Sequence, residues 1–178
     1  MKEYKLPIGC DVPETIILAD GDFPSHPLAL EWLRQCPYVV CCDGAANTYI
    51  RSGRMPEAIV GDGDSLLPDI KERYASLIHS EAEQETNDLS KAFRFCLSQE
   101  RKRITIMGAT GKREDHTIGN VSLLADYMEQ AEVSMMTDYG IFVPIREDSM
   151  FESYIGQQIS VFNMNSTALS AEGLFRVF

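Results

Sequence analysis

Short apolar runs alternate with segments of helical periodicity between residues 15 and 129 of the chain. The runs are rich in β-branched residues, end in glycine or charged residues, and cover residues 15–19, 38–42, 58–60 and 103–107. Helical periodicity occurs at residues 26–35, 45–52, 86–99 and 115–129. Strands that alternate with helices at this spacing predict βαβ units. We therefore expect an α/β fold with a mostly parallel sheet flanked by helices.

The pattern changes after residue 131, where helical periodicity nearly disappears. Further short apolar runs lie at residues 133–136, 140–145 and 158–162. Runs of strands without intervening helices are typical of an all-β unit. The expected organisation is an α/β domain over residues 1–131 and a smaller, sandwich-like β domain over residues 132–178.

The charge balance excludes some classes of function. The chain has 16 Lys and Arg against 27 Asp and Glu, which gives a formal net charge of −11. Such acidity argues against a nucleic-acid or anionic-membrane binder that works by charge neutralisation. No run approaches the roughly 18 apolar residues of a membrane span. Five cysteines without a CxxC pair favour reduced thiols, so a cytoplasmic location is expected.

Acidic and glycine residues follow the ends of several predicted strands. Asp43 and Gly44 follow one strand, a Gly-Asp-Gly-Asp-Ser sequence at 61–65 follows the next, and a glycine-rich loop begins at Gly108. Asp88 opens the segment with the strongest helical pattern. Ligands of α/β sheets bind beyond the carboxyl ends of the strands. This arrangement indicates a site for a metal ion and phosphate groups.

Asp62 and Asp64 are candidates for metal ligands. In an extended stretch, residues i and i+2 point the same way, so both carboxylates could approach one cation. Mg²⁺ prefers one or two carboxylates together with substrate phosphates. A solvated acidic turn is the alternative, because Gly-Asp-Gly-Asp-Ser also has ordinary turn composition.

The loop at residues 108–113 is not a P-loop, because only two residues separate its glycines and Arg113 follows Lys112. A glycine loop between a strand and a helix still offers backbone N–H groups to an anion. Arg113 adds a guanidinium that binds phosphate oxygens in pairs. Lys91, three residues after Asp88, is equally suited to a phosphate contact and to an ion pair within its helix.

Four motifs in one order resemble the thiamine pyrophosphokinase family. They are Asp43-Gly-Ala-Ala-Asn47, Gly61-Asp-Gly-Asp-Ser65, Gln84-x-x-x-Asp88-x-x-Lys91-Ala92 and Gly108-x-x-Gly111-x-Arg113-x-Asp115-His116-x-x-x-Asn120. A weaker match, Ser170-x-x-Gly173-Leu174, resembles an element of the family's thiamine-binding half. Enzymes of this family transfer the β,γ-diphosphate of ATP to the hydroxyl of thiamine and release AMP. The resemblance implies that activity, an α/β domain followed by a β-sandwich, and a homodimer.

The resemblance also implies roles for individual residues. Mg²⁺ would be held by Asp43, Asp62, Asp64 and Asp88. ATP would be bound by Asp43, Gly44, Lys91, Thr110, Gly111 and Arg113, and thiamine by Gln84, Asp115, Asn120 and Ser170. Asp62, Asp88, Arg113 and Asp115 would carry the catalysis, with Asp88 and Asp115 both open as general base.

Two departures from the family pattern bear on these expectations. Gly63 stands where the family usually carries Phe or another bulky residue, and the sequence stops soon after Leu174, so an incomplete β unit is expected. Two alternative functions use the same kind of scaffold: diphosphoryl transfer to another small alcohol, such as a hydroxymethylpterin, and nucleotide or thiamine binding without turnover. A haloacid-dehalogenase-like phosphatase fits less well, because Gly61 separates the strand from Asp62 and the 108–116 cluster is left without a role.

Overall fold

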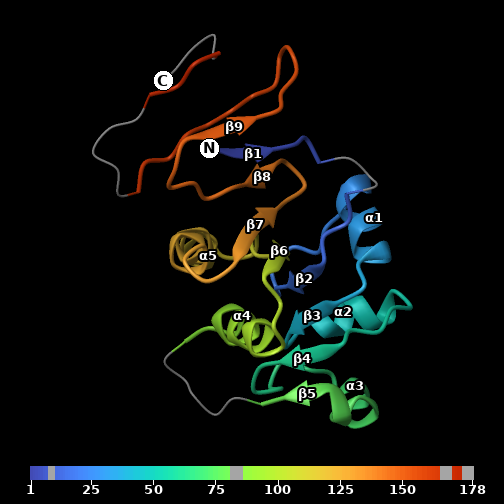
Figure 1. The fold of residues 1–178 in the computed structure, drawn as a ribbon. Coiled ribbons are helices and arrows are strands. Elements are labelled where there is room, and N and C mark those ends of the chain that lie inside the picture. The colour runs from blue at the N-terminus through green and yellow to red at the C-terminus, as the bar shows by residue number, and fades with distance from the viewer. Residues whose placement is uncertain (8–10, 81–85, 165–169, 174–178) are drawn as a thin grey trace.

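A seven-stranded sheet forms the centre of the computed structural model, which describes residues 1–7, 11–80, 86–164 and 170–173. Its strand order within the described residues is β5-β4-β3-β2-β6-β7-β8 (Figure 1). The strands are β2 (Thr15–Leu18), β3 (Val39–Cys42), β4 (Ala58–Val60), β5 (Ile78–His79), β6 (Arg103–Met107), β7 (Glu132–Met136) and β8 (Ile141–Phe142). All neighbouring pairs are parallel except β7 with β8. The predicted α/β class is confirmed.

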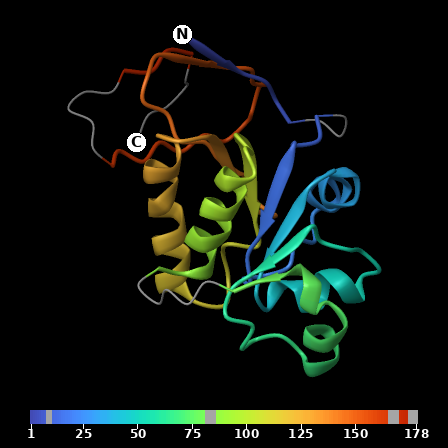
Figure 2. The same cartoon turned by 60° about the horizontal axis from the view of Figure 1, so that its bottom comes forward.

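Helices cover both faces of this sheet. One face carries α1 (Pro27–Gln35), α2 (Ala45–Arg51) and α3 (Pro68–Arg73), the last followed by a short 3₁₀ turn, η1 (Ala75–Leu77). The other face carries α4 (Asp88–Ser98) and α5 (Glu114–Tyr127). Figures 1 and 2 show the two groups of helices on opposite sides of the strands. None of the helices in the described part of the chain is long and apolar enough to cross a membrane.

Burial on both faces explains the continuous apolar runs of the central strands. In β2, Ile16 and Leu18 pack in the cluster beneath α1 and α2, whereas Ile17 packs in the cluster beneath α4 and α5. All three side chains are fully buried. Successive side chains of a strand point to opposite faces, so a strand with helices on both sides needs apolar residues at every position.

The helix with the strongest sequence pattern, α4, is built as predicted. The Asn87 side chain accepts a hydrogen bond from the Ser90 N–H (2.9 Å) and caps the helix. The buried stripe includes Leu89, Ala92, Phe93 and Cys96. The Phe93 ring stacks on Tyr127 of α5 with a centroid separation of 3.9 Å, and this contact joins the two helices on their face of the sheet.

A second, two-stranded sheet joins the amino-terminal segment to a strand of the carboxy-terminal part of the chain. β1 (Lys2–Tyr4) pairs in parallel with β9 (Ser149–Phe151), and the rings of Tyr4 and Phe151 stack at 4.6 Å. Figure 1 shows this pair beyond the β8 edge of the large sheet. The small carboxy-terminal β unit that the sequence predicts is therefore present, and it includes a strand from the amino terminus.

Three strands predicted for the carboxy-terminal unit need correction. The strands expected at residues 133–136 and 140–145 are β7 and β8, and both belong to the large sheet, where β7 pairs with β6 and β8 pairs with β7. The missing helix after β7 suggested a new unit, but β7 completes the last βαβ crossover and is followed by an edge hairpin. Residues 158–162, expected as a strand, lie outside any strand. The pattern also missed α3 and β5, which are too short for periodicity to reveal.

The order of the strands places a switch in chain direction between β2 and β6. From β2 the chain moves outward through β3, β4 and β5, and it then returns across the sheet through α4 to β6 on the other side of β2. Such a switch leaves room for a ligand at the carboxyl ends of the strands. The loops that follow β2, β3, β4 and β6 meet at this edge.

Removal of the Phe93 ring tests the packing between α4 and α5. Phe93 is 1% exposed, so Phe93→Ala leaves a cavity and is expected to lower the free energy of unfolding by about 3–5 kcal/mol. Urea unfolding followed by circular dichroism measures this change, with the exposed Phe151→Ala as a control for loss of a ring. A loss below about 1 kcal/mol at Phe93 would contradict the packing described here.

Candidate active site

The loops that follow β2 and β6 are held together by backbone hydrogen bonds. The Gly21 N–H donates to the Gly108 carbonyl (2.6 Å), and the Asp22 N–H donates to the Thr110 carbonyl (2.8 Å). Gly111 has a φ of +79°, and a Cβ there would overlap the Asp22 carboxylate. Only glycine allows both this backbone conformation and this approach, so the close contact of the two loops depends on Gly111.

Asp43 is the most buried carboxylate of the site. Its residue is 4% exposed, its Oδ2 accepts a hydrogen bond from the Ser65 N–H (3.0 Å), and its Oδ1 has no hydrogen-bond partner. A Cβ on Gly61 would lie 2.8 Å from the Asp43 Cβ and 3.4 Å from the Asp88 Cγ. Gly61 therefore lies between Asp43 and Asp88 and lets their carboxylates approach each other.

The electrostatics of Asp43 reflect this crowding. Burial raises the pKa of its carboxyl group, and the charges of Asp88 and Asp62 raise it further, against the opposing hydrogen bond from Ser65. A buried carboxylate with an unpartnered oxygen and two acidic neighbours is unfavourable by itself. A cation placed among these groups would relieve both the repulsion and the missing hydrogen bond.

Asp62 and Asp64 lie in a turn and not in an extended stretch. The Asp62 Oδ1 accepts a hydrogen bond from the Asp64 N–H (3.0 Å), and both residues are exposed. Gly63 has a φ of +77°, and its carbonyl accepts a hydrogen bond from Lys71 Nζ (2.9 Å). The prediction that Asp62 and Asp64 point the same way, as alternate residues of an extended stretch, is therefore wrong. Within the described residues, no group of three or more His, Cys, Asp or Glu side chains is already arranged to hold a metal ion.

The two candidate cations each contact a carboxylate of the site. Lys91, 5% exposed, pairs with Asp88 at 3.2 Å. Of the two alternatives for Lys91, an ion pair within its helix or a phosphate contact, the ion pair is therefore present. Arg113 binds Asp115 through two hydrogen bonds of 3.0 and 2.5 Å on the exposed surface. The Arg113 hydrogen bond lowers the pKa of Asp115.

Two acidic residues of the β2 loop were missed by the sequence analysis as site residues. Asp20 accepts hydrogen bonds from Lys112 Nζ through its carbonyl (2.9 Å) and its Oδ1 (3.1 Å), and a Cβ on Gly44 would lie 2.5 Å from its Oδ2. Asp22 lies against Gly111. The available signal was their position directly after the first strand, where Asp-Gly was interpreted only as a turn.

A small cavity of about 80 Å³ opens beside these loops at the same edge. Its lining includes Asp22, Thr110 and Asp138. Asp138, which follows β7, accepts hydrogen bonds from the N–H groups of Ser25 and His26 (2.9 Å each) and from the Ser25 hydroxyl (2.5 Å). These bonds lower the pKa of Asp138 and connect the β7 loop to the start of α1.

The residues expected to bind thiamine differ in burial and in their contacts. Asn120 is buried, donates from Nδ2 to the Ala109 carbonyl (2.8 Å) and accepts from Asn87 Nδ2 (3.2 Å). Asp115 is exposed at the start of α5, and Ser170 is exposed near the end of the described chain. Gln84 lies outside the described residues.

A doubly wound sheet with acidic and glycine-rich loops at its switch point defines an α/β protein of the class that binds ligands at that edge. Family models refine this class. The model described as "Thiamin pyrophosphokinase, catalytic domain" matches residues 29–136, and that of the "substrate-binding domain" matches residues 140–176. The chain belongs to the thiamin pyrophosphokinase family, as the motifs predict.

Individual relatives agree with this assignment. Thiamine pyrophosphokinase 1 of Oryza sativa subsp. japonica is 30% identical over 129 residues, which cover 58% of this chain and 49% of the rice protein. Thiamin pyrophosphokinase 1 of Caenorhabditis elegans is 30% identical over 110 residues, covering 57% of this chain and 45% of the nematode protein. The chain therefore spans about half the length of these curated relatives.

Solved structures show the same fold. The yeast thiamin pyrophosphokinase has a TM-score of 0.60 at 19% identity, covering 76% of this chain and 63% of that one. The thiamin pyrophosphokinase from Geobacillus thermodenitrificans has a TM-score of 0.56 at 27% identity, covering 68% of this chain and 58% of that one.

Asn120 gives a test that separates a structural role from substrate contact. Asn120→Ala leaves the buried Ala109 carbonyl without its side-chain donor and is expected to lower the free energy of unfolding by about 1–3 kcal/mol. Ser122→Ala on the exposed side of α5 is the control. Unchanged stability together with a raised KM for thiamine would instead favour the substrate contact that the resemblance implies.

Asp138 predicts a pH dependence of stability. Because its pKa is lowered in the folded chain, its stabilising effect is complete above the ordinary carboxyl pKa of 3.8 and is lost as the pH falls through the lowered folded value. Above that range, the free energy of unfolding of the wild type is expected to exceed that of Asp138→Asn by about 1 kcal/mol. The difference is small because solvent weakens charged hydrogen bonds at an exposed position. Urea unfolding at a series of pH values measures it, and a gain that grows on acidification would contradict the assignment.

Proposed function

We propose that this chain takes part in the transfer of the β,γ-diphosphate of ATP to the hydroxyl of thiamine, with release of AMP. It either catalyses this reaction by itself or forms the nucleotide-binding half of the site that does. The observation that carries the proposal is the unpartnered Oδ1 of buried Asp43, with Asp88 and Asp62 as acidic neighbours. Beside it lies a glycine-rich loop held against the β2 loop. Membership of the thiamin pyrophosphokinase family supports the choice of substrates.

The donor set fits a divalent cation. Carboxylate oxygens are the ligands that Mg²⁺ prefers, and Asp43, Asp62, Asp64 and Asp88 would hold it. When bound, Mg²⁺ neutralises charge on the phosphate oxygens and the leaving AMP. The missing partner of Asp43 and the raised pKa of its carboxyl group are the features that support this fit.

The chain's own residues would bind and orient the phosphates. Backbone N–H groups of the 108–111 loop are suited to donate hydrogen bonds to an anion beside the amino-terminal end of α5. Arg113 forms an ion pair with Asp115 in which both side chains are more than half exposed, so exchange of Asp115 for a phosphate costs little. Lys91 remains buried against Asp88 and would hold that carboxylate in position.

Each candidate general base forms an ion pair with a cationic side chain. The lowered pKa of Asp115 keeps it ionised but makes it a weak proton acceptor, and Asp88 is engaged with Lys91. We infer that catalysis rests on in-line positioning and charge neutralisation, which supply most of the rate enhancement in phosphoryl transfer. Asp115, once released from Arg113, would be free to attract the cationic thiazolium ring of thiamine.

The assembly, location and domain division belong to the same proposal. We propose a homodimer, as the family resemblance implies, and a cytoplasmic location. The four described cysteines, Cys36, Cys41, Cys42 and Cys96, are free thiols, which suits a reducing compartment. We place the domain division between the family-model matches that end at 136 and begin at 140, so that the edge strand β8 of the large sheet belongs to the second match.

Substitution of a carboxylate at the proposed metal site tests the assignment. Asp62→Asn and Asp88→Asn are each expected to lower turnover at least about 100-fold, because each removes charge that neutralises the cation, while the circular dichroism spectrum is retained. The assay measures AMP released from ATP and Mg²⁺ in the presence of thiamine. Asp126→Asn, an exposed change on α5, is the control, and a fully active Asp62→Asn protein would refute the metal role.

The same assay separates the alternatives. AMP release with a hydroxymethylpterin but not with thiamine would indicate a different acceptor. Calorimetric binding of ATP or thiamine without AMP release would indicate a binding form without turnover.

A further inference from the structure

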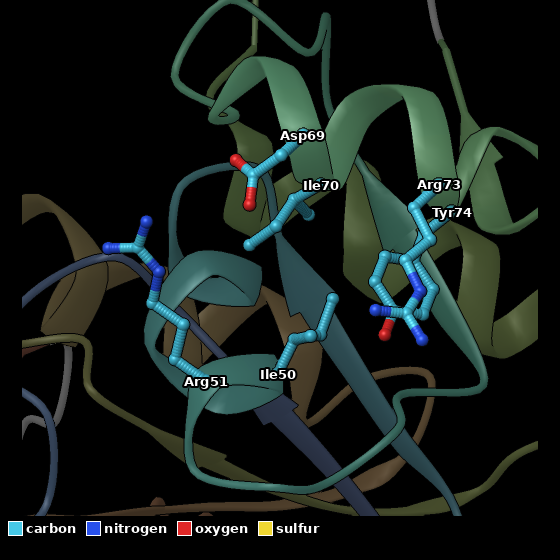
Figure 3. Close-up of a pocket in the computed structure, with 6 residues that line it drawn as sticks. All are labelled: Ile50, Arg51, Asp69, Ile70, Arg73 and Tyr74. Carbon is cyan, nitrogen blue, oxygen red and sulfur yellow. The ribbon is translucent and has the colours of Figure 1, made fainter.

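A pocket of about 290 Å³ lies between α2 and α3, on the face of the sheet that α1, α2 and α3 cover. Its lining is Ile50 and Arg51 from the end of α2, Asp69, Ile70 and Arg73 from α3, and Tyr74 directly after it. Figure 3 shows Ile50 and Ile70 in the middle, with Arg51 on one side and Arg73 and Tyr74 on the other. The volume lies at the lower end of the range for ligand sites, so an occupant would be small.

The charge of the pocket contrasts with that of the chain. Two arginines and one aspartate line it, in a protein with a formal net charge of −11. Among the described residues, no ion pair involves Arg51 or Arg73, and Arg73 lies over the Tyr74 ring at 5.6 Å. Free guanidinium groups recognise carboxylate and phosphate oxygens with paired hydrogen bonds. The apolar floor of buried Ile70 and half-buried Ile50 and Tyr74 suits a flat, nonpolar group.

Both helices that form the pocket are tied to the loops of the candidate active site. Asn47 of α2 donates to the Ser65 carbonyl (2.8 Å) and accepts from the Leu67 N–H (3.0 Å). Lys71 of α3 donates to the Gly63 carbonyl (2.9 Å), and the Ser65 N–H binds Asp43 (3.0 Å). A ligand that fixes α2 against α3 therefore also fixes residues 63–67.

We propose that this pocket is a second binding site for a small anion carried on a flat apolar group, and that its occupancy stabilises the 63–67 loop beside the candidate metal ligands. The arginines on the two sides of the pocket attract the anionic group, and the ring rests on Ile50, Ile70 and Tyr74. Occupancy and loop order are coupled reciprocally, because the same hydrogen bonds join them. Binding at this pocket does not depend on the proposed enzymatic function.

Phenyl phosphate is the probe for the site. Calorimetry on the full chain is expected to show saturable binding that Arg51→Ala and Arg73→Ala each weaken about tenfold or more, since each removes a charge-assisted contact. Asp69→Asn is expected to tighten binding, because it removes the one negative charge in the lining. Two variants serve as controls. Arg54→Ala controls for nonspecific charge, because Arg54 is a neighbouring arginine that binds Ser52 and lies outside the lining. Arg113→Ala controls for binding at the candidate active site.

Binding that survives both Arg51→Ala and Arg73→Ala, or that is lost in Arg113→Ala, would overturn the site. The coupling is read from amide hydrogen exchange of Ser65 and Leu67, which phenyl phosphate is expected to slow in the wild type but not in Arg51→Ala. Unchanged exchange in the saturated wild type would overturn the coupling. Since neither readout involves ATP, thiamine or turnover, failure of the proposed function would leave these results interpretable.

Discussion

β2 lies between β3 and β6, and its backbone hydrogen bonds to both neighbours join the two halves of the sheet. The chain leaves β2 in one direction and returns on its other side, so this position makes the switch point. The loops after β2 and β6 consequently meet in direct hydrogen bonds. Three features of the candidate site depend on this order of strands. They are the burial of Asp43, the approach of Asp88 to Asp43 past Gly61, and the contact of the glycine-rich loop with the β2 loop.

The candidate site carries a cost in folding that the proposed cation would offset. Asp43 is buried beside two other carboxylates with one oxygen unpartnered, which is unfavourable in the free chain. Lys91 and Arg113 each neutralise a nearby carboxylate. Unsatisfied buried polar groups are rare in folded proteins, and a bound ion is one of the features that satisfies them; the acidic neighbours of Asp43 are the reason for placing the proposed cation here.

Much of the fold follows from the sequence because short, doubly buried strands and an amphipathic helix carry strong local signals. The strands at Thr15–Leu18 and Arg103–Met107 and the helix at Asp88–Ser98 are examples. Prediction failed where the signal was not local. β7 has no following helix and was assigned to the wrong unit, and α3 is shorter than two helical turns. The β1–β9 pair joins residues almost 150 positions apart, a contact that no periodicity reveals.

For the site, the sequence determined which residue types stand after which strands and, through four motifs, the family to which the chain belongs. It did not determine how they meet. Gly63 adopts a left-handed conformation that turns Asp62 and Asp64 out of an extended stretch, Asn120 is buried between α4 and the 108–111 loop, and Asp20 and Asp22 reach the glycine loop. Those outcomes were decided by tertiary structure, because hydrogen bonding, burial and close approach between distant loops depend on strand order and packing rather than on local spacing.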